Sequence, residues 1–254
     1  MADVDAIYWG YIVHKKSLLL SSLIYVVFCG SSSWAATRTQ LEKYVCEATI
    51  FIETEYGTGS GVAFRLGKYP RDKYILTAYH VVEAAIENKS AIKMRSHGMP
   101  KSTGQATELS GWHVFHDLAS IRLPEGMRKV RPLKISMKYM PAGTPVGIYS
   151  FPLGKFEKSL GYVGGMKTVS INTPGGDSYV PKYYFTNFVQ PGSSGGMMVD
   201  RNARLVGIVT HGVNALRTKD KAIVNMGGLG TPTQVIANLV KQAYKNEWKP
   251  EKNR

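Results

Sequence analysis

The chain has 254 residues, of which 44% are hydrophobic and 26 are glycine, and its formal net charge is +14. This length suits one large pair of β-domains or two small domains with a buried core. The two cysteines, Cys29 and Cys46, exclude a disulfide framework. The lysines and arginines are scattered without a nucleic-acid-binding motif, so we expect a solvated basic surface and no nucleic-acid partner.

The N-terminal segment has the three parts of a secretory signal. A basic triplet at residues 14–16 precedes a mostly apolar run at 17–28, and small residues follow up to Ala36. The apolar run of about 12 residues is short for a membrane span, which takes about 20. We therefore expect residues 1–36 to be a signal peptide that exports the protein to the periplasm or the medium. A retained anchor is the alternative, and only this would place the protein at a membrane.

From about residue 40 onward, short runs rich in Val, Ile, Tyr and Phe alternate with glycine and proline turns, which predicts an all-β sandwich or barrel. A polar segment at 124–134 divides these runs into two sets. We expect a first β-barrel over residues 40–125, a second over 126–245 and a basic tail over 246–254. The runs expected to be strands lie at 48–52, 61–64, 74–78, 118–123, 146–151 and 205–209.

Two helices are expected, a short one over residues 80–87 and a longer one over 233–244. Pro232 suits the start of the longer helix. Its apolar face consists of Val235, Ile236, Leu239 and Val240, which recur at helical spacing.

Three stretches supply the residue types that acyl transfer to water requires, in the order His80, Asp117 and Ser194. A neutral hydroxyl needs a base beside it, and imidazole accepts a proton near neutral pH. A carboxylate behind the imidazole fixes its tautomer. We therefore predict Ser194 as nucleophile, His80 as general base and Asp117 as the orienting carboxylate. The glycines around Ser194 allow a tight turn that aims the N–H groups of Gly192 and Ser194 at an oxyanion.

These stretches resemble the Thr-Ala-x-His, Asp-Leu-Ala and Gly-x-Ser-Gly-Gly motifs of trypsin-like peptidases. Residues 57–62, 191–196 and 228–232 are also similar to the bacterial HtrA/Deg protease domain. The resemblance implies a chymotrypsin-like fold of two six-stranded antiparallel β-barrels with a C-terminal helix. It further implies a secreted serine endopeptidase that cleaves polypeptides through an acyl-enzyme, without a cofactor.

The sequence also departs from the family. Ser193 replaces the aspartate that zymogen-type members use to bind a freed N-terminus, so activation by N-terminal clipping is not expected. About 20 residues follow the start of the C-terminal helix, so we expect no PDZ module of the kind that HtrA proteins usually carry.

By the same resemblance, the expected substrate-binding residues are Phe188, Val189, Thr210, His211, Gly212 and Gly228. No acidic residue falls at the base of this pocket, so we expect an apolar or small residue before the cleaved bond. An acidic residue is the alternative, because glutamyl endopeptidases also use a pocket histidine.

Other functions are weighed against this one. His113 and His116 suggest a metal pair, but strand positions three apart point to opposite faces and no further ligands complete a site, so no metal is expected. A protease-fold binding or chaperone-like protein with little turnover is the main alternative. An esterase with the same triad is disfavoured, because α/β-hydrolases carry the triad in the order Ser, acid, His. The oligomeric state is left open.

Overall fold

A computed structural model describes residues 39–65, 73–173, 176–217 and 223–238. The predictions for residues 1–36 and 246–254 lie outside these ranges. The chain divides into two units between residues 40 and 41, and the second unit contains two β-structures. In the described part of the chain, no helix combines the length and the apolar content that a membrane crossing needs.

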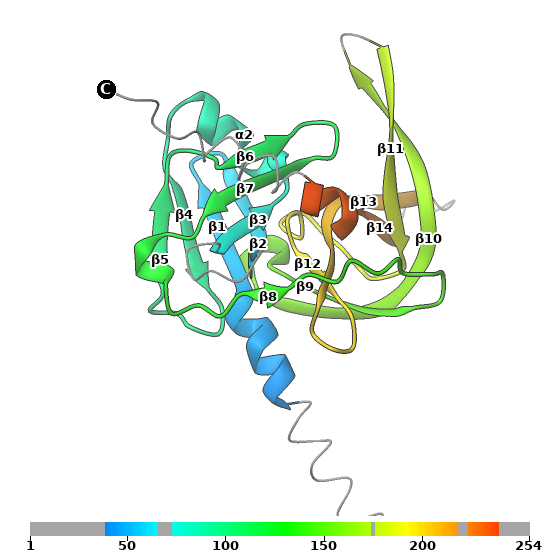
Figure 1. The fold of residues 1–254 in the computed structure, drawn as a ribbon. Coiled ribbons are helices and arrows are strands. Elements are labelled where there is room, and N and C mark those ends of the chain that lie inside the picture. Colours follow the sequence, from blue (N-terminus) through cyan, green and yellow to red (C-terminus); the bar gives the residue numbers. More distant parts are fainter. Residues whose placement is uncertain (1–38, 66–72, 174–175, 218–222, 239–254) are drawn as a thin grey trace, which may run out of the picture. The chain divides into compact units, whose positions relative to one another are not determined.

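The first β-structure of the second unit is a sheet in the order β5-β4-β1-β2-β3-β7-β6, with β8 paired to β2 in parallel (Figure 1). Side chains alternate across it: in β4, Ile92 and Met94 are buried and Lys93 and Arg95 are exposed. The strands are β1 (Thr49–Thr54), β2 (Gly57–Arg65), β3 (Lys73–Thr77), β4 (Ile92–Ser96), β5 (Thr103–Ala106), β6 (Gly111–His113), β7 (Leu118–Arg122) and β8 (Leu133–Lys134).

The second β-structure is a closed barrel in the order β10-β11-β14-β13-β12-β9. Closure removes the unpaired edges that an open sheet would expose. The first two of these strands form a long hairpin that extends well beyond the rest of the barrel (Figure 1). The strands are β9 (Pro145–Ser150), β10 (Glu157–Thr173), β11 (Gly176–Phe185), β12 (Met197–Val199), β13 (Leu205–Arg217) and β14 (Ile223–Pro232).

The predicted all-β, two-barrel fold class is confirmed. Within the described residues the second barrel has six strands as expected, whereas the first sheet has eight. The additional strands are short, and β8 contains only two residues, so their hydrophobic pattern is too brief to detect. The polar segment 124–134 contains the 3-10 helix η1 (Glu125–Met127) and β8. The division at residue 125 remains a prediction.

The two predicted helices are found. The helix α2 (Tyr79–Glu87) follows β3 and buries Val82 and Ala85. The C-terminal helix begins at Thr233, whose hydroxyl donates to the carbonyl oxygen of Ser136 at 2.5 Å, and its described part covers residues 233–238. Residues 41–48 are also helical, and a 3-10 helix, η2 (Pro152–Gly154), follows β9.

Candidate active site

His80 and Asp117 contact each other through two hydrogen bonds. His80 is the second residue of α2, and its backbone N–H donates to Oδ1 of Asp117 at 3.0 Å. The other carboxylate oxygen lies 2.8 Å from Nδ1 of the His80 ring. A carboxylate only accepts hydrogen bonds, so Nδ1 carries the proton and Nε2 is left as the acceptor. Asp117 thus satisfies an unpaired N–H at the start of the helix and orients the imidazole.

The backbone of Asp117 is in the left-handed region, with φ of 51°. This residue ends a turn between β6 and β7 that is closed by the Asp117 N–H donating to the carbonyl of Val114 at 2.9 Å. Aspartate tolerates this conformation better than most residues, and such conformations are concentrated at functional sites. The turn places the carboxylate, 11% exposed, against the first turn of α2.

Two opposing influences act on the pKa of Asp117. Burial raises it, whereas the hydrogen bonds from the ring and backbone of His80 and the positive fields of His80 and His211 lower it. Together, the influences that lower the pKa outweigh the effect of burial, so the pKa of Asp117 lies below its ordinary value. Asp117 is therefore a carboxylate at neutral pH.

Ser194 lies at the edge of the second barrel, in the loop before β12, and its backbone contacts the first sheet. Its carbonyl oxygen accepts the N–H of Ser60 at 2.8 Å. A Cβ on Gly59 would lie 2.5 Å from Cγ1 of Val81 and 3.3 Å from the same carbonyl oxygen, so only glycine lets the loop approach α2 this closely. These contacts bring the Ser194 backbone next to the helix that carries His80.

Hydrogen bonds fix two peptide groups of the Ser194 loop. The carbonyl of Pro191 accepts the N–H of Leu153 at 2.9 Å, and the carbonyl of Ser193 accepts the N–H of Gly196 at 2.9 Å. In a trans peptide the N–H points opposite to the C=O, so the N–H groups of Gly192 and Ser194 point away from these partners. In the described residues neither N–H donates a hydrogen bond. Gly192 has φ of 92°, which requires glycine.

The two adjacent serines differ in their surroundings. Ser193 is buried, and its hydroxyl accepts the N–H of Gln190 at 3.1 Å. Ser194 is half-buried, and its Oγ makes no hydrogen bond to any described residue. Nε2 of His80 is likewise unpaired within the described ranges, so Ser194 Oγ and His80 Nε2 are not yet in hydrogen-bond contact. Catalytic hydrogen bonds often close only when substrate binds.

Ser60 supports the Ser194 loop, which the sequence analysis did not predict. Its backbone N–H donates to the carbonyl of Ser194, and its Oγ donates to the carbonyl of Gly192 at 2.7 Å. The Oγ of Ser60 also accepts the N–H of Phe151 at 2.8 Å. Its carbonyl oxygen accepts the hydroxyl of Thr77 at 2.7 Å. The only sequence signal is its place in the glycine-rich stretch 57–62, which shows small side chains but not their partners.

The predicted substrate-binding residues occupy two environments. Phe188 and His211 are exposed, and the His211 ring centroid lies 6.0 Å from that of His80. Val189 packs in the barrel core, and a Cβ on Gly212 would lie 3.5 Å from it. Gly228, buried, pairs with Gly212 across β13 and β14. The sixth residue, Thr210, is buried, and its hydroxyl donates to the carbonyl of Leu229 at 3.2 Å.

A lysine is buried between the two β-structures near these residues. Lys182 on β11 is 1% exposed, and its Nζ donates to the carbonyl of His116 at 2.7 Å. It also donates to Oγ1 of Thr231 at 2.6 Å and to Oγ1 of Thr210 at 3.3 Å. Burial lowers the pKa of Lys182 to about 8, and the negative charge of Asp117, which raises this pKa, offsets only part of the effect.

The prediction that His113 and His116 point to opposite faces is wrong. Their ring centroids lie 4.5 Å apart, because β6 ends at His113 and a turn follows. Burial, the neighbouring His113 and the Lys182 charge lower the pKa of His116 to about 4. Among the described residues, no group of three or more His, Cys, Asp or Glu side chains could hold a metal ion.

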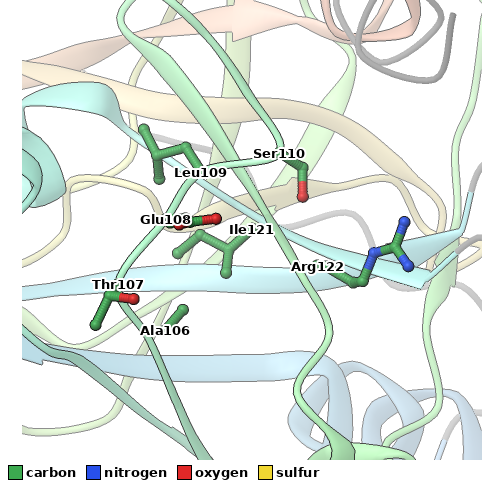
Figure 2. Close-up of a pocket in the computed structure, with 7 residues that line it drawn as sticks. All are labelled: Ala106, Thr107, Glu108, Leu109, Ser110, Ile121 and Arg122. Carbon is green, nitrogen blue, oxygen red and sulfur yellow. The ribbon is translucent and has the colours of Figure 1, made fainter. Parts of the chain in front are cut away.

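A surface hollow of about 440 Å³ lies on the first sheet, between the connection from β5 to β6 and strand β7 (Figure 2). Its lining residues are Ala106, Thr107, Glu108, Leu109, Ser110, Ile121 and Arg122. It contains none of the candidate active-site residues, so the hollow has no part in the chemistry described above.

The stretches that contain these residues lie within a known family domain. Residues 59–208 match the trypsin-like peptidase domain. The chain belongs to the trypsin-like peptidase family. The match covers most of β2, all of α2, the Asp117 turn and the Ser194 loop. The predicted resemblance to an HtrA-type protease domain is confirmed by the relatives.

The relatives of this trypsin-like peptidase include HtrA proteins. The serine protease Do-like HtrA of Bacillus subtilis is 29% identical over 180 residues, which are 69% of this chain and 37% of that protein. The serine protease HtrA-like of Staphylococcus epidermidis is 29% identical over 167 residues, 62% of this chain and 27% of that protein. The chain thus spans about a third of the length of these curated relatives.

Solved structures share the fold. A mutant of Rv3671c from M. tuberculosis H37Rv, in an inactive form, has a TM-score of 0.61 at 17% identity, with 85% of this chain and 91% of that chain covered. The serine endoprotease from Yersinia pestis has a TM-score of 0.59 at 18% identity, with 82% and 67% covered. These likenesses establish the trypsin-like peptidase fold.

Proposed function

We propose that the chain is a serine endopeptidase that hydrolyses peptide bonds through Ser194, His80 and Asp117. The observation that carries this proposal is the double hydrogen bond of Asp117, to the ring and to the backbone of His80. It fixes the tautomer whose Nε2 accepts a proton, beside a loop that holds a serine hydroxyl without a hydrogen-bond partner among the described residues.

The reaction begins when Ser194 Oγ attacks the carbonyl carbon of the substrate and passes its proton to Nε2 of His80. The bond to the leaving amine then breaks, and the same nitrogen returns the proton to that amine. Water repeats the sequence on the acyl-enzyme, and Asp117 stabilises the imidazolium in both halves. A rotation of the Ser194 side chain closes its contact with His80 when substrate binds.

The N–H groups of Gly192 and Ser194 are proposed to form the oxyanion hole. Their peptide planes are held by the bonds to Leu153 and Gly196, so the donors need no reorganisation during the reaction. Preorganised donors of this kind are typically worth about 2.7–4 kcal/mol each. The loop is thereby ready for the tetrahedral intermediate before substrate arrives.

Substrate is proposed to bind along the edge formed by residues 210–212, with its side chain before the cleaved bond near Phe188 and Val189. An apolar or small side chain fits these neighbours. Because His211 lies beside this edge, an acidic side chain before the cleaved bond is the alternative. Desolvation, Lys182 and His80 lower the pKa of His211 while Asp117 raises it, so the ring offers an anion a neutral N–H donor at neutral pH.

We further propose that the protein acts after export, with residues 1–36 as the signal. The sequence pattern of that segment supports this proposal, and a retained anchor is its alternative. The substrates are polypeptides, as expected for the family. The proposed division into barrels at 40–125 and 126–245 places His80 and Asp117 in the first and Ser194 in the second.

The decisive experiment treats the purified protein with an organophosphonate probe beside a Ser194→Ala variant, with casein cleavage measured in parallel. We expect one label per chain, located on Ser194 by mass spectrometry, and casein hydrolysis that the variant abolishes. The exposed Ser170→Ala variant is the matched control and should behave as the wild type. Wild type that neither labels nor cleaves casein would favour the binding or chaperone-like function, and labelling without cleavage would favour an esterase or a very narrow peptidase.

A further inference from the structure

A buried cation connects the two β-structures directly behind the proposed triad. Lys182 belongs to the barrel, and its ammonium reaches the carbonyl of His116, the residue before Asp117 in the first sheet. Thr231, also from the barrel, donates its hydroxyl proton to the same carbonyl at 2.7 Å. One carbonyl of the Asp117 turn thus accepts two hydrogen bonds from the opposite barrel.

The donors and acceptors around Lys182 match an ammonium group. The hydroxyl protons of Thr231 and Thr210 are already committed to the carbonyls of His116 and Leu229. Both hydroxyl oxygens can therefore only accept from Nζ. Three acceptors face Nζ, and an ammonium has three protons to give, whereas a neutral amine has two.

A buried, hydrogen-bonded ammonium is weak evidence for a purely structural role. A buried ammonium loses its hydration, and well-packed apolar side chains commonly stabilise as much or more. The hydrogen-bond partner of Lys182 is also specific. It is the carbonyl of His116, and the next residue, Asp117, orients His80. The placement therefore points to a role at the site.

We propose that Lys182 is a positioning residue. It holds the Asp117 turn of the first sheet in a fixed position relative to the barrel, which carries the Ser194 loop. This inference rests on the proposed function, and it extends it to a residue outside the triad. Lys182 does not touch the reacting atoms. It acts through the His116 carbonyl on Asp117 and through Asp117 on the His80 ring.

Several titratable groups surround this ammonium. Asp117, His113 and His116 face it from the first sheet, and His211 faces it from β13. Asp117 is the one acid among them. The turn therefore experiences the Lys182 charge together with the hydrogen bond, and both are lost when Lys182 is replaced by a neutral side chain.

The test compares Lys182→Met with Lys138→Met, an exposed lysine on the connection between β8 and β9. Two quantities are measured: the rate of labelling by the organophosphonate probe and the downfield proton resonance of His80 Nδ1–H. We expect Lys182→Met to label about 10–100-fold more slowly and to shift or broaden the resonance, as small displacements of catalytic groups do. Lys138→Met should match the wild type in both.

A second pair, Thr231→Val and Thr231→Ser, keeps the proposal testable if Lys182→Met does not fold. We expect valine to slow labelling and serine to restore it to within twofold, because serine keeps the hydroxyl. The proposal is overturned if Lys182→Met labels within twofold of wild type with an unchanged resonance, or if Thr231→Ser is as slow as Thr231→Val. If the wild type does not label, the proposed function fails, and the resonance alone decides the role of Lys182.

Discussion

Replacing Lys182 by methionine should change how stability depends on pH. Burial lowers the pKa of this lysine from 10.5 to about 8 in the folded protein, although the charge of Asp117 opposes the change. In the unfolded chain the lysine is hydrated and titrates near its ordinary value. The folded and unfolded states therefore bind different numbers of protons between these two pKa values.

The sign follows from this difference. Below pH 8 both states hold the proton, and the folded protein bears the full cost of the buried charge. Between pH 8 and 10.5 the folded state has lost the proton while the unfolded state keeps it, so stability rises with pH. At 1.36 kcal/mol for each pH unit between the two pKa values, the gain is about 3 kcal/mol, and Lys182→Met lacks it.

The assay is urea-induced unfolding of wild type and Lys182→Met at pH 7 and at pH 10.5. Tyr79, Tyr149 and Tyr183, whose pKa values burial raises, also titrate in alkaline solution. Their contribution is shared by both proteins and cancels in the difference between the two free energies of unfolding. Between pH 7 and pH 10.5, that difference should change by about 3 kcal/mol in favour of wild type. A movement below about 1 kcal/mol would refute the reasoning, because Lys182 would then titrate as an exposed lysine does.

Three further predictions concern the site and use two variants. Asp117→Asn should slow organophosphonate labelling at pH 7 by about 10⁴-fold, because the amide no longer fixes the His80 tautomer; a loss below tenfold would contradict this. The folded-state pKa of Asp117 lies below 3.8, so the stability from its carboxylate is present above that value and lost as pH falls through the folded-state pKa. Acid unfolding should accordingly bring wild type and Asp117→Asn closer together in stability, and a constant gap would argue against the shift. Gly192→Ala places a Cβ 2.5 Å from the Phe151 carbonyl oxygen at φ of 92°, so labelling should fall by about 10²–10³-fold while the circular dichroism spectrum is kept.

Local patterns predicted much of this candidate site, because each motif is short and contiguous. The residues around His80 predict a strand that leads into a helix, and this is the order of β3 and α2. Small residues around Ser194 predict a tight turn, and the positive φ of Gly192 and Gly195 agrees with it. The barrel core was likewise visible as apolar runs.

Other features depend on contacts between distant residues. Lys182 is one of 32 basic residues, and nothing beside it in the chain distinguishes it from the exposed ones. Ser60 lies 132 residues before Gly192, to whose carbonyl its hydroxyl donates. The side-chain directions of His113 and His116 were predicted wrongly, because the end of β6 is set by its pairing with β7.

The sequence alone determined which residue types could carry out acyl transfer and in which order they occur, since these follow from local motifs. The tertiary structure alone decided which side chains support them. Burial and hydrogen bonding join segments more than a hundred residues apart, as in the bond from Thr231 to the His116 carbonyl. A side chain's environment is a property of the packed fold, and for this reason a lysine that reads as a surface charge lies at 1% exposure behind the proposed triad.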